Sequence, residues 1–131
     1  MAGETDLAAM LATLDVERRP GTFAFVSGDH PGVAASAVAM VAEEEAVTWV
    51  VPIDVARAVG PEPEFEAAWL TLTVHSALDA VGLTAAFSRA LGDAEIACNV
   101  LAGYHHDHLL VPAHRADDAI MALRALAASS R

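Results

Sequence analysis

Apolar residues follow two spacings along the first half of the chain, one typical of helices and one of strands. Leu7, Met10 and Leu14 recur at the spacing of a single helix face. The run from Thr22 to Val26 is short and β-prone, and glycine and proline follow it closely. The pattern predicts a helix, a strand, a hairpin and a second helix, over residues 4–14, 22–26, 37–51 and 53–59. We expect no helix between the first strand and the hairpin.

The second half shows the same two spacings after a proline-rich boundary at residues 61–63. Residues 69–74 alternate between Leu or Val and Trp or Thr, as a half-buried strand does. The pattern then predicts a helix, two strands joined near Gly103 and a last helix, over residues 81–91, 96–101, 106–111 and 116–126. This β-α-β-β-α order is the ferredoxin-like split βαβ arrangement without its fourth strand. We expect the strand at 23–26 to supply that fourth strand.

A weak internal repeat relates the two halves. Val51-Pro52 recurs as Val111-Pro112, and Ala42 recurs as Ala102, both 60 residues further along the chain. Each half would then contain a hairpin followed by a helix. The fold class is therefore predicted to be α+β, with antiparallel sheets whose helices lie on one face. The predicted domains are residues 1–63, a degenerate first half, and residues 64–131.

The charge balance limits the partners that the protein can have. Eighteen acidic residues against seven basic ones give a formal charge of −11, which repels a phosphate backbone, so we expect no nucleic-acid partner. The apolar stretches are shorter than the roughly 18 to 20 residues of a membrane span, so we expect no membrane-spanning helix. The acidic N-terminus and the single Cys98 indicate a cytoplasmic protein.

Several segments resemble those of a bacterial group of stand-alone tandem ACT-domain proteins. The resemblance rests on residues 72–86, 96–100 and 104–112, and extends through residues 21–25 and 43–48 of the first half. It implies ferredoxin-like ACT units in tandem. ACT domains serve amino-acid biosynthetic enzymes as ligand sensors. The resemblance therefore implies a regulatory protein that binds a small molecule, such as an amino acid, forms a homodimer, and has no catalytic activity.

In ACT domains the ligand lies between the loop after the first strand and the second strand. Carried over by position, the implied ligand-binding residues are Asp79, Ala80, Val81, Gly82, Leu83, Asn99 and Val100. A helix N-terminus has unpaired N–H groups that can bind a carboxylate, and Gly82 allows close backbone approach. Asn99 offers a donor and an acceptor to an amino group. The corresponding loop of the first half, residues 29–32, is interpreted as a turn, and we expect no second site there.

Two alternatives stay open, an oligomeric interaction domain without a ligand and a metal-dependent enzyme. The metal alternative uses His105, His106, Asp107 and His108, because imidazole and carboxylate groups suit Zn²⁺ or non-haem iron. On a strand, however, His106 and His108 share one face while His105 and Asp107 share the other. One ion could then meet two of the four at most, with His75 or His114 needed as well. We therefore expect neither a metal nor a cofactor.

No catalytic residue is predicted. Cys98 lies in a predicted strand on the same face as two apolar residues, Ile96 and Val100. A thiol in such surroundings is usually inert, and its pKa tends upward.

Overall fold

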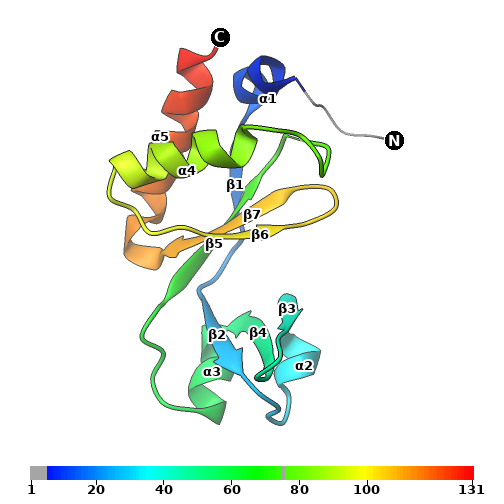
Figure 1. Cartoon of the computed structure of the whole chain (residues 1–131). Helices are drawn as coiled ribbons and strands as arrows, with labels where there is room; N and C mark the ends of the chain where they lie inside the picture. Colours follow the sequence, from blue (N-terminus) through cyan, green and yellow to red (C-terminus); the bar gives the residue numbers. More distant parts are fainter. Residues whose placement is uncertain (1–5, 75) are drawn as a thin grey trace. The chain divides into compact units, whose positions relative to one another are not determined.

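The computed structural model describes residues 6–74 and 76–131 (Figure 1). The chain forms two compact units, which are described separately. Unit 2 is the continuous segment Pro20–Ala67, and unit 1 joins the described residues up to Arg19 to Ala68–Arg131. The division into domains at residues 63 and 64 rests on the proline-rich stretch at residues 61–63, with support from the sequence repeat, and stays a prediction. None of the helices in the described part of the chain is long and apolar enough to cross a membrane.

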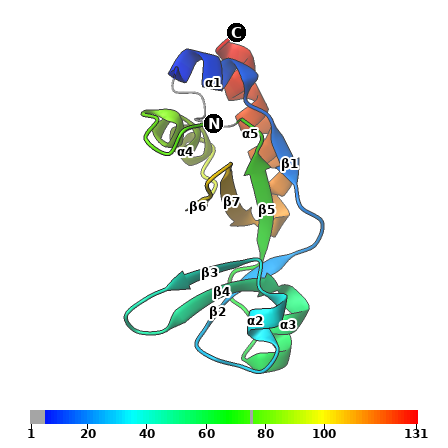
Figure 2. The same cartoon turned by 90° about the vertical axis from the view of Figure 1, so that its right-hand side faces the viewer.

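Unit 1 combines an antiparallel sheet with helices that pack on one face (Figures 1 and 2). Its strands lie in the order β1-β5-β7-β6. They are β1 (Val16–Arg18), β5 (Ala67–Leu72), β6 (Asn99–Ala102) and β7 (Asp107–Pro112). The helices are α1 (Leu7–Thr13), α4 (Leu83–Asp93) and α5 (Ala116–Ser129), and the short 3₁₀ helix η1 (Ala113–Arg115) precedes α5.

The core of unit 1 lies between the helices and one face of this sheet. Alternate residues of β5 and β7, including Leu70 and Leu109, point to that face and are fully buried. They share one apolar cluster with Phe87 of α4, Leu123 of α5 and Met10 of α1. This arrangement confirms the predicted α+β fold with helices on one face of an antiparallel sheet.

The fourth strand of unit 1 is β1, and the prediction that the strand at 23–26 supplies it is wrong. Val16 pairs with Leu72 and Arg18 with Leu70, both antiparallel. The predicted strand is β2 (Phe23–Ser27), which meets β5 at one pair only, Phe23 with Ala67, two residues of unit 2. A strand of three residues in which only the first is buried shows too little alternation to be detected in a sequence.

Unit 2 has the same element order as the second half of unit 1. Its strands lie in the order β3-β4-β2, where β3 is Ala39–Ala42 and β4 is Val47–Pro52. Its helices are α2 (Val33–Ser36) and α3 (Ile53–Val59). The expectation of no helix before the hairpin is wrong, because α2 forms one turn there after its N-cap residue Gly32, whose φ of +82° suits glycine.

The two hairpins have the same register at an offset of 60 residues. Ala39 pairs with Val50 in unit 2, and Asn99 pairs with Leu110 in unit 1. The remaining three pairs of each hairpin correspond in the same way. Each second strand ends at a proline and leads into a helix. The structure therefore confirms the internal repeat and two βαββα units in tandem.

Candidate functional site

The predicted ligand loop leads into the N-terminus of α4. Gly82 is the N-cap residue of α4, with a left-handed φ of +100°. It has no side chain with which to cap the first turn, and no acidic residue lies in that turn. The backbone N–H groups of this turn therefore present donors and a partial positive charge, the properties that bind an anion.

A cavity of about 90 Å³ adjoins this helix end. It lies between the loop, the first turn of α4 and the turn that joins β6 to β7. Its lining residues are Ser76, Ala77, Leu78, Ala80, Leu83, Thr84, Ala102, Gly103 and Asp107. The cavity thus combines two hydroxyl groups and a carboxylate with the amide donors at the beginning of α4.

Asp107 is the residue of this cavity that the ligand-site prediction missed. It is half-buried at the start of β7, on the same strand face as the core residues Leu109 and Val111. Burial raises the pKa of its carboxyl group, although His108 and His106 act in the opposite direction. In the sequence, Asp107 is a candidate only as a metal ligand. An acidic residue on the core-facing side of a strand was the signal that could have identified it.

The structure separates the two predicted strand residues from each other. Asn99 pairs with Leu110 and Val100 with Leu109, so their side chains point to opposite faces of the sheet. Val100 packs against the core on the face that α4 covers. Asn99 is exposed on the other face. Its role in ligand binding stays a prediction.

The five predicted loop residues are contiguous, but only two of them line the cavity. Ala80 and Leu83 contribute to its wall, on either side of Gly82 in sequence. Asp79 is exposed, and the Val81 side chain is 82% exposed. The N–H group of Ala80 donates a hydrogen bond to the carbonyl oxygen of Ala77 at 3.0 Å, which closes a turn before α4.

His108 lies on the sheet face opposite Asp107 and bonds to neighbouring strand residues. Its Nδ1 atom is 2.9 Å from Oγ1 of Thr71, which also accepts a hydrogen bond from Nε1 of Trp69 at 3.1 Å. The His108 and Trp69 rings are 5.0 Å apart. Burial lowers the pKa of His108, and the nearby charges of His106 and Arg19 lower it further. The predicted alternation of His108 and Asp107 is confirmed.

Within residues 6–74 and 76–131, no three His, Cys, Asp or Glu side chains come together as a metal site. His75, which was considered as a further ligand, lies outside the described residues.

Cys98 immediately precedes β6 and packs partly against the core of unit 1. Burial raises the pKa of its thiol to about 11. The predicted upward shift is confirmed, and the thiol is therefore almost fully protonated at neutral pH.

The tandem βαββα units and the glycine-capped helix end define an ACT-like protein. Sequence comparison agrees over nearly the whole chain, since one ACT domain family matches residues 64–125 and another matches residues 2–68. The chain belongs to the ACT domain family.

Several solved structures are similar to this chain. A protein of unknown function from Vibrio cholerae, described as a possible transport protein, is 36% identical over 92% of this chain and 95% of its own, with a TM-score of 0.80. A protein from Agobacterium tumefaciens is 20% identical over 87% and 89%, with a TM-score of 0.65. The ligand-free regulatory subunit of aspartate kinase from Thermus thermophilus shares the fold, at 13% identity over 85% and 95%, with a TM-score of 0.61. No curated protein sequence matches the chain.

Proposed function

We propose that this protein is a regulatory ACT-type sensor that binds a small amino acid at the N-terminus of α4 and catalyses no reaction. The observation that carries the proposal is the presence of two complementary groups at one cavity. The first turn of α4 offers amide donors and has no side-chain cap, and Asp107 offers a carboxylate. An amino acid has a carboxylate for the former and an ammonium group for the latter.

The remaining lining residues define the size and polarity of the ligand. Ser76 and Thr84 add hydroxyl groups that can donate or accept hydrogen bonds, and Leu83 adds an apolar wall. A volume of about 90 Å³ equals that of roughly three water molecules in the liquid. The cavity therefore suits an amino acid with a short side chain.

Regulation through this site requires an output, and we infer that the output is homodimerisation. Among the described strands, β6 ends the order of the sheet beside β7, so one edge of β6 offers backbone groups to a second copy. Asn99 and Val100 begin this strand. Ala102, at its other end, lines the cavity, so ligand and dimer contact would lie close together. Sedimentation equilibrium with and without ligand tests this step, and a monomer under both conditions contradicts it.

Likeness to a regulatory subunit of aspartate kinase supports the regulatory part of the proposal. The protonated thiol of Cys98 and the bonded imidazole of His108 support the absence of catalysis, because neither is poised as a nucleophile.

A thermal-unfolding screen against the amino acids tests the proposed function. A ligand at 100 times its dissociation constant stabilises the folded state by about 2.7 kcal/mol, which gives a measurable rise in Tm. We expect the small amino acids to give the largest rise. Asp107→Asn should abolish that rise, and Asn99→Ala should also abolish it if Asn99 binds the ligand as predicted from the sequence. A screen in which no amino acid raises the Tm would remove amino-acid sensing from consideration.

A further inference from the structure

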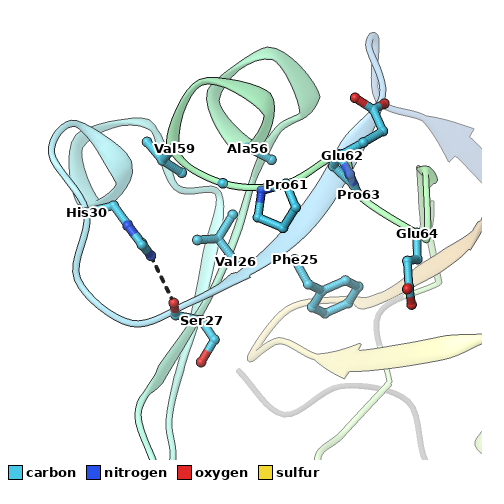
Figure 3. A pocket seen from close by; sticks show the side chains of 11 residues that line it. Phe25, Val26, Ser27, His30, Ala56, Val59, Pro61, Glu62, Pro63 and Glu64 are labelled. Carbon is cyan, nitrogen blue, oxygen red and sulfur yellow. Dashed lines mark hydrogen bonds between the residues drawn. The ribbon is translucent and has the colours of Figure 1, made fainter.

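Unit 2 contains a second and larger cavity, of about 450 Å³. It is bounded by β2, by α3 and by the segment Gly60–Glu64 that follows α3. Figure 3 shows the side chains of Val26, Ala56, Val59 and Pro61 gathered at its apolar side, with the Phe25 ring beside Glu64. Cavities of roughly 300 to 1,000 Å³ are typical of small-molecule sites.

The outer wall of this cavity is held in place by Arg57 of α3. Its Nε atom lies 2.9 Å from Oε1 of Glu62, and one of its terminal nitrogens lies 2.8 Å from Oε1 of Glu66. Figure 3 shows the Glu62 carboxylate directed away from Phe25 and Val26, in agreement with this pairing. Pro61 and Pro63 restrict the backbone of the same segment. The ion pairs and the two prolines therefore restrict the segment that bounds the cavity.

The apolar part of the lining suits an aromatic or branched ligand. The Phe25 side chain is 38% exposed although it is aromatic, and its ring stacks on Phe65 with a centroid distance of 6.3 Å. A ligand ring placed against Phe25 would cover exposed apolar surface and extend this stack.

The polar part of the lining selects a cation. Glu62 and Glu64 line the cavity, whereas no Lys or Arg is among its lining residues. Glu62 is paired with Arg57, which leaves Glu64 as the carboxylate beside the Phe25 ring (Figure 3). The Nε2 atom of His30 is 3.1 Å from the carbonyl oxygen of Ser27, which can only accept, so Nε2 carries a proton. A ligand carboxylate would be repelled by Glu64, whereas an ammonium group would be attracted to it.

We propose that this cavity binds a small hydrophobic amine, with its apolar body against Phe25 and α3 and its ammonium group toward Glu64. This site is distinct from the amino-acid site proposed in unit 1, which binds both a carboxylate and an ammonium group. No sequence pattern predicted this site, since only His30 of the loop at residues 29–32 lines the cavity. The remaining lining residues come from β2, α3 and the segment after α3.

Titration of the full chain with 2-phenylethylamine, followed by amide chemical shifts, tests this proposal. We expect saturable shifts concentrated at residues 25–27 and 60–64, and no saturable shifts with phenylacetate, which has the same ring and the opposite charge. Equal binding of both compounds, or no saturable binding of the amine at millimolar concentration, would overturn the proposal.

Three variants identify the groups that bind the amine. Glu64→Gln should weaken binding about fivefold, as expected for loss of one partly exposed ion pair. Glu44→Gln is the matched control, because Glu44 is an exposed acid in the β3–β4 turn and does not line the cavity. Phe25→Ala should weaken binding by removing the stacking surface, and circular dichroism shows whether that variant is folded. An equal loss of affinity in the two glutamate variants would contradict the role of Glu64.

Discussion

A Cβ atom at Gly82 would lie 2.8 Å from Cδ2 of Leu7, so a side chain of α1 fills the space beside the residue that begins α4. The φ of +100° restricts the position to glycine, and the partly exposed Leu7 side chain would have to shift as well. Gly82→Ala should therefore destabilise the protein by about 1 to 3 kcal/mol, through backbone strain and displacement of Leu7. Urea unfolding measures this change in free energy.

Gly92 provides a matched control within the same helix. A Cβ atom there would meet no neighbouring atom within 4 Å. Because Gly92 lies inside α4, Gly92→Ala should stabilise the protein by up to about 1 kcal/mol. If Gly82→Ala and Gly92→Ala destabilise the protein equally, then neither the left-handed backbone at Gly82 nor its contact with Leu7 explains the loss.

Asp107 is expected to reduce stability at neutral pH. Burial raises the pKa of its carboxyl group, so the folded protein binds that proton more tightly than the unfolded chain does. The protonated carboxyl group therefore makes its full contribution to stability below the unfolded pKa of about 3.9. This contribution is lost as the pH rises through the folded pKa. Asp107→Asn removes this penalty and should raise the Tm at pH 7, while at low pH it should change the Tm little.

The exposed Asp93 at the end of α4 serves as the control for this substitution. Asp93→Asn should leave ligand binding unchanged. If Asp107→Asn lowers the Tm at pH 7, the carboxylate stabilises the fold and is not held for a ligand.

Thr71 connects Trp69 to His108 through its hydroxyl group. Thr71→Val keeps the shape of the side chain but removes both hydrogen bonds, and should cost about 1 to 2 kcal/mol of unfolding free energy. Thr71→Ser keeps the hydroxyl group and should recover most of that loss. Urea unfolding followed by Trp69 fluorescence in a Trp49→Phe background compares the two variants. Similar losses in Val and Ser variants would assign the effect to packing.

Cys98 should react slowly in the folded protein. With its pKa raised to about 11, the thiolate fraction at pH 8 is on the order of a hundredfold below that of an exposed cysteine. Labelling with a thiol-specific disulfide reagent should therefore be slow in buffer and fast in concentrated urea. Equal rates in the two conditions would contradict the burial of this side chain.

Much of the fold could be predicted because its elements have clear periodicity. Helix α3 begins and ends where the pattern places it, at Ile53 and Val59, since glycine and proline follow directly. The start of β5 was placed two residues late because Ala67 and Ala68, although fully buried, give no alternation signal. Strand β1 was missed because its pairing with β5 depends on residues more than 50 positions away.

The candidate site was harder to predict than the fold. Gly82 and its loop could be placed from the sequence because a helix start leaves a local signature. Asp107 joins that loop only through the packing of β7 beneath α4, which no local pattern reveals. Asn99 and Val100 are neighbours on one strand, so their side chains point to opposite faces of the sheet. The predicted ligand site included both residues although they lie on opposite faces.

The proposed function requires two groups of one cavity to bind the two charges of an amino acid. Titration of the protein with the amino acid that gives the largest Tm rise, and with its analogue lacking the amino group, tests this directly through the amide shifts of residues 82–86. We predict saturable binding of the amino acid to the natural protein, and at least tenfold weaker binding both of the analogue and of the amino acid to Asp107→Asn. Equal affinities for the amino acid and its analogue, or binding without shifts at the start of α4, would contradict the proposed site.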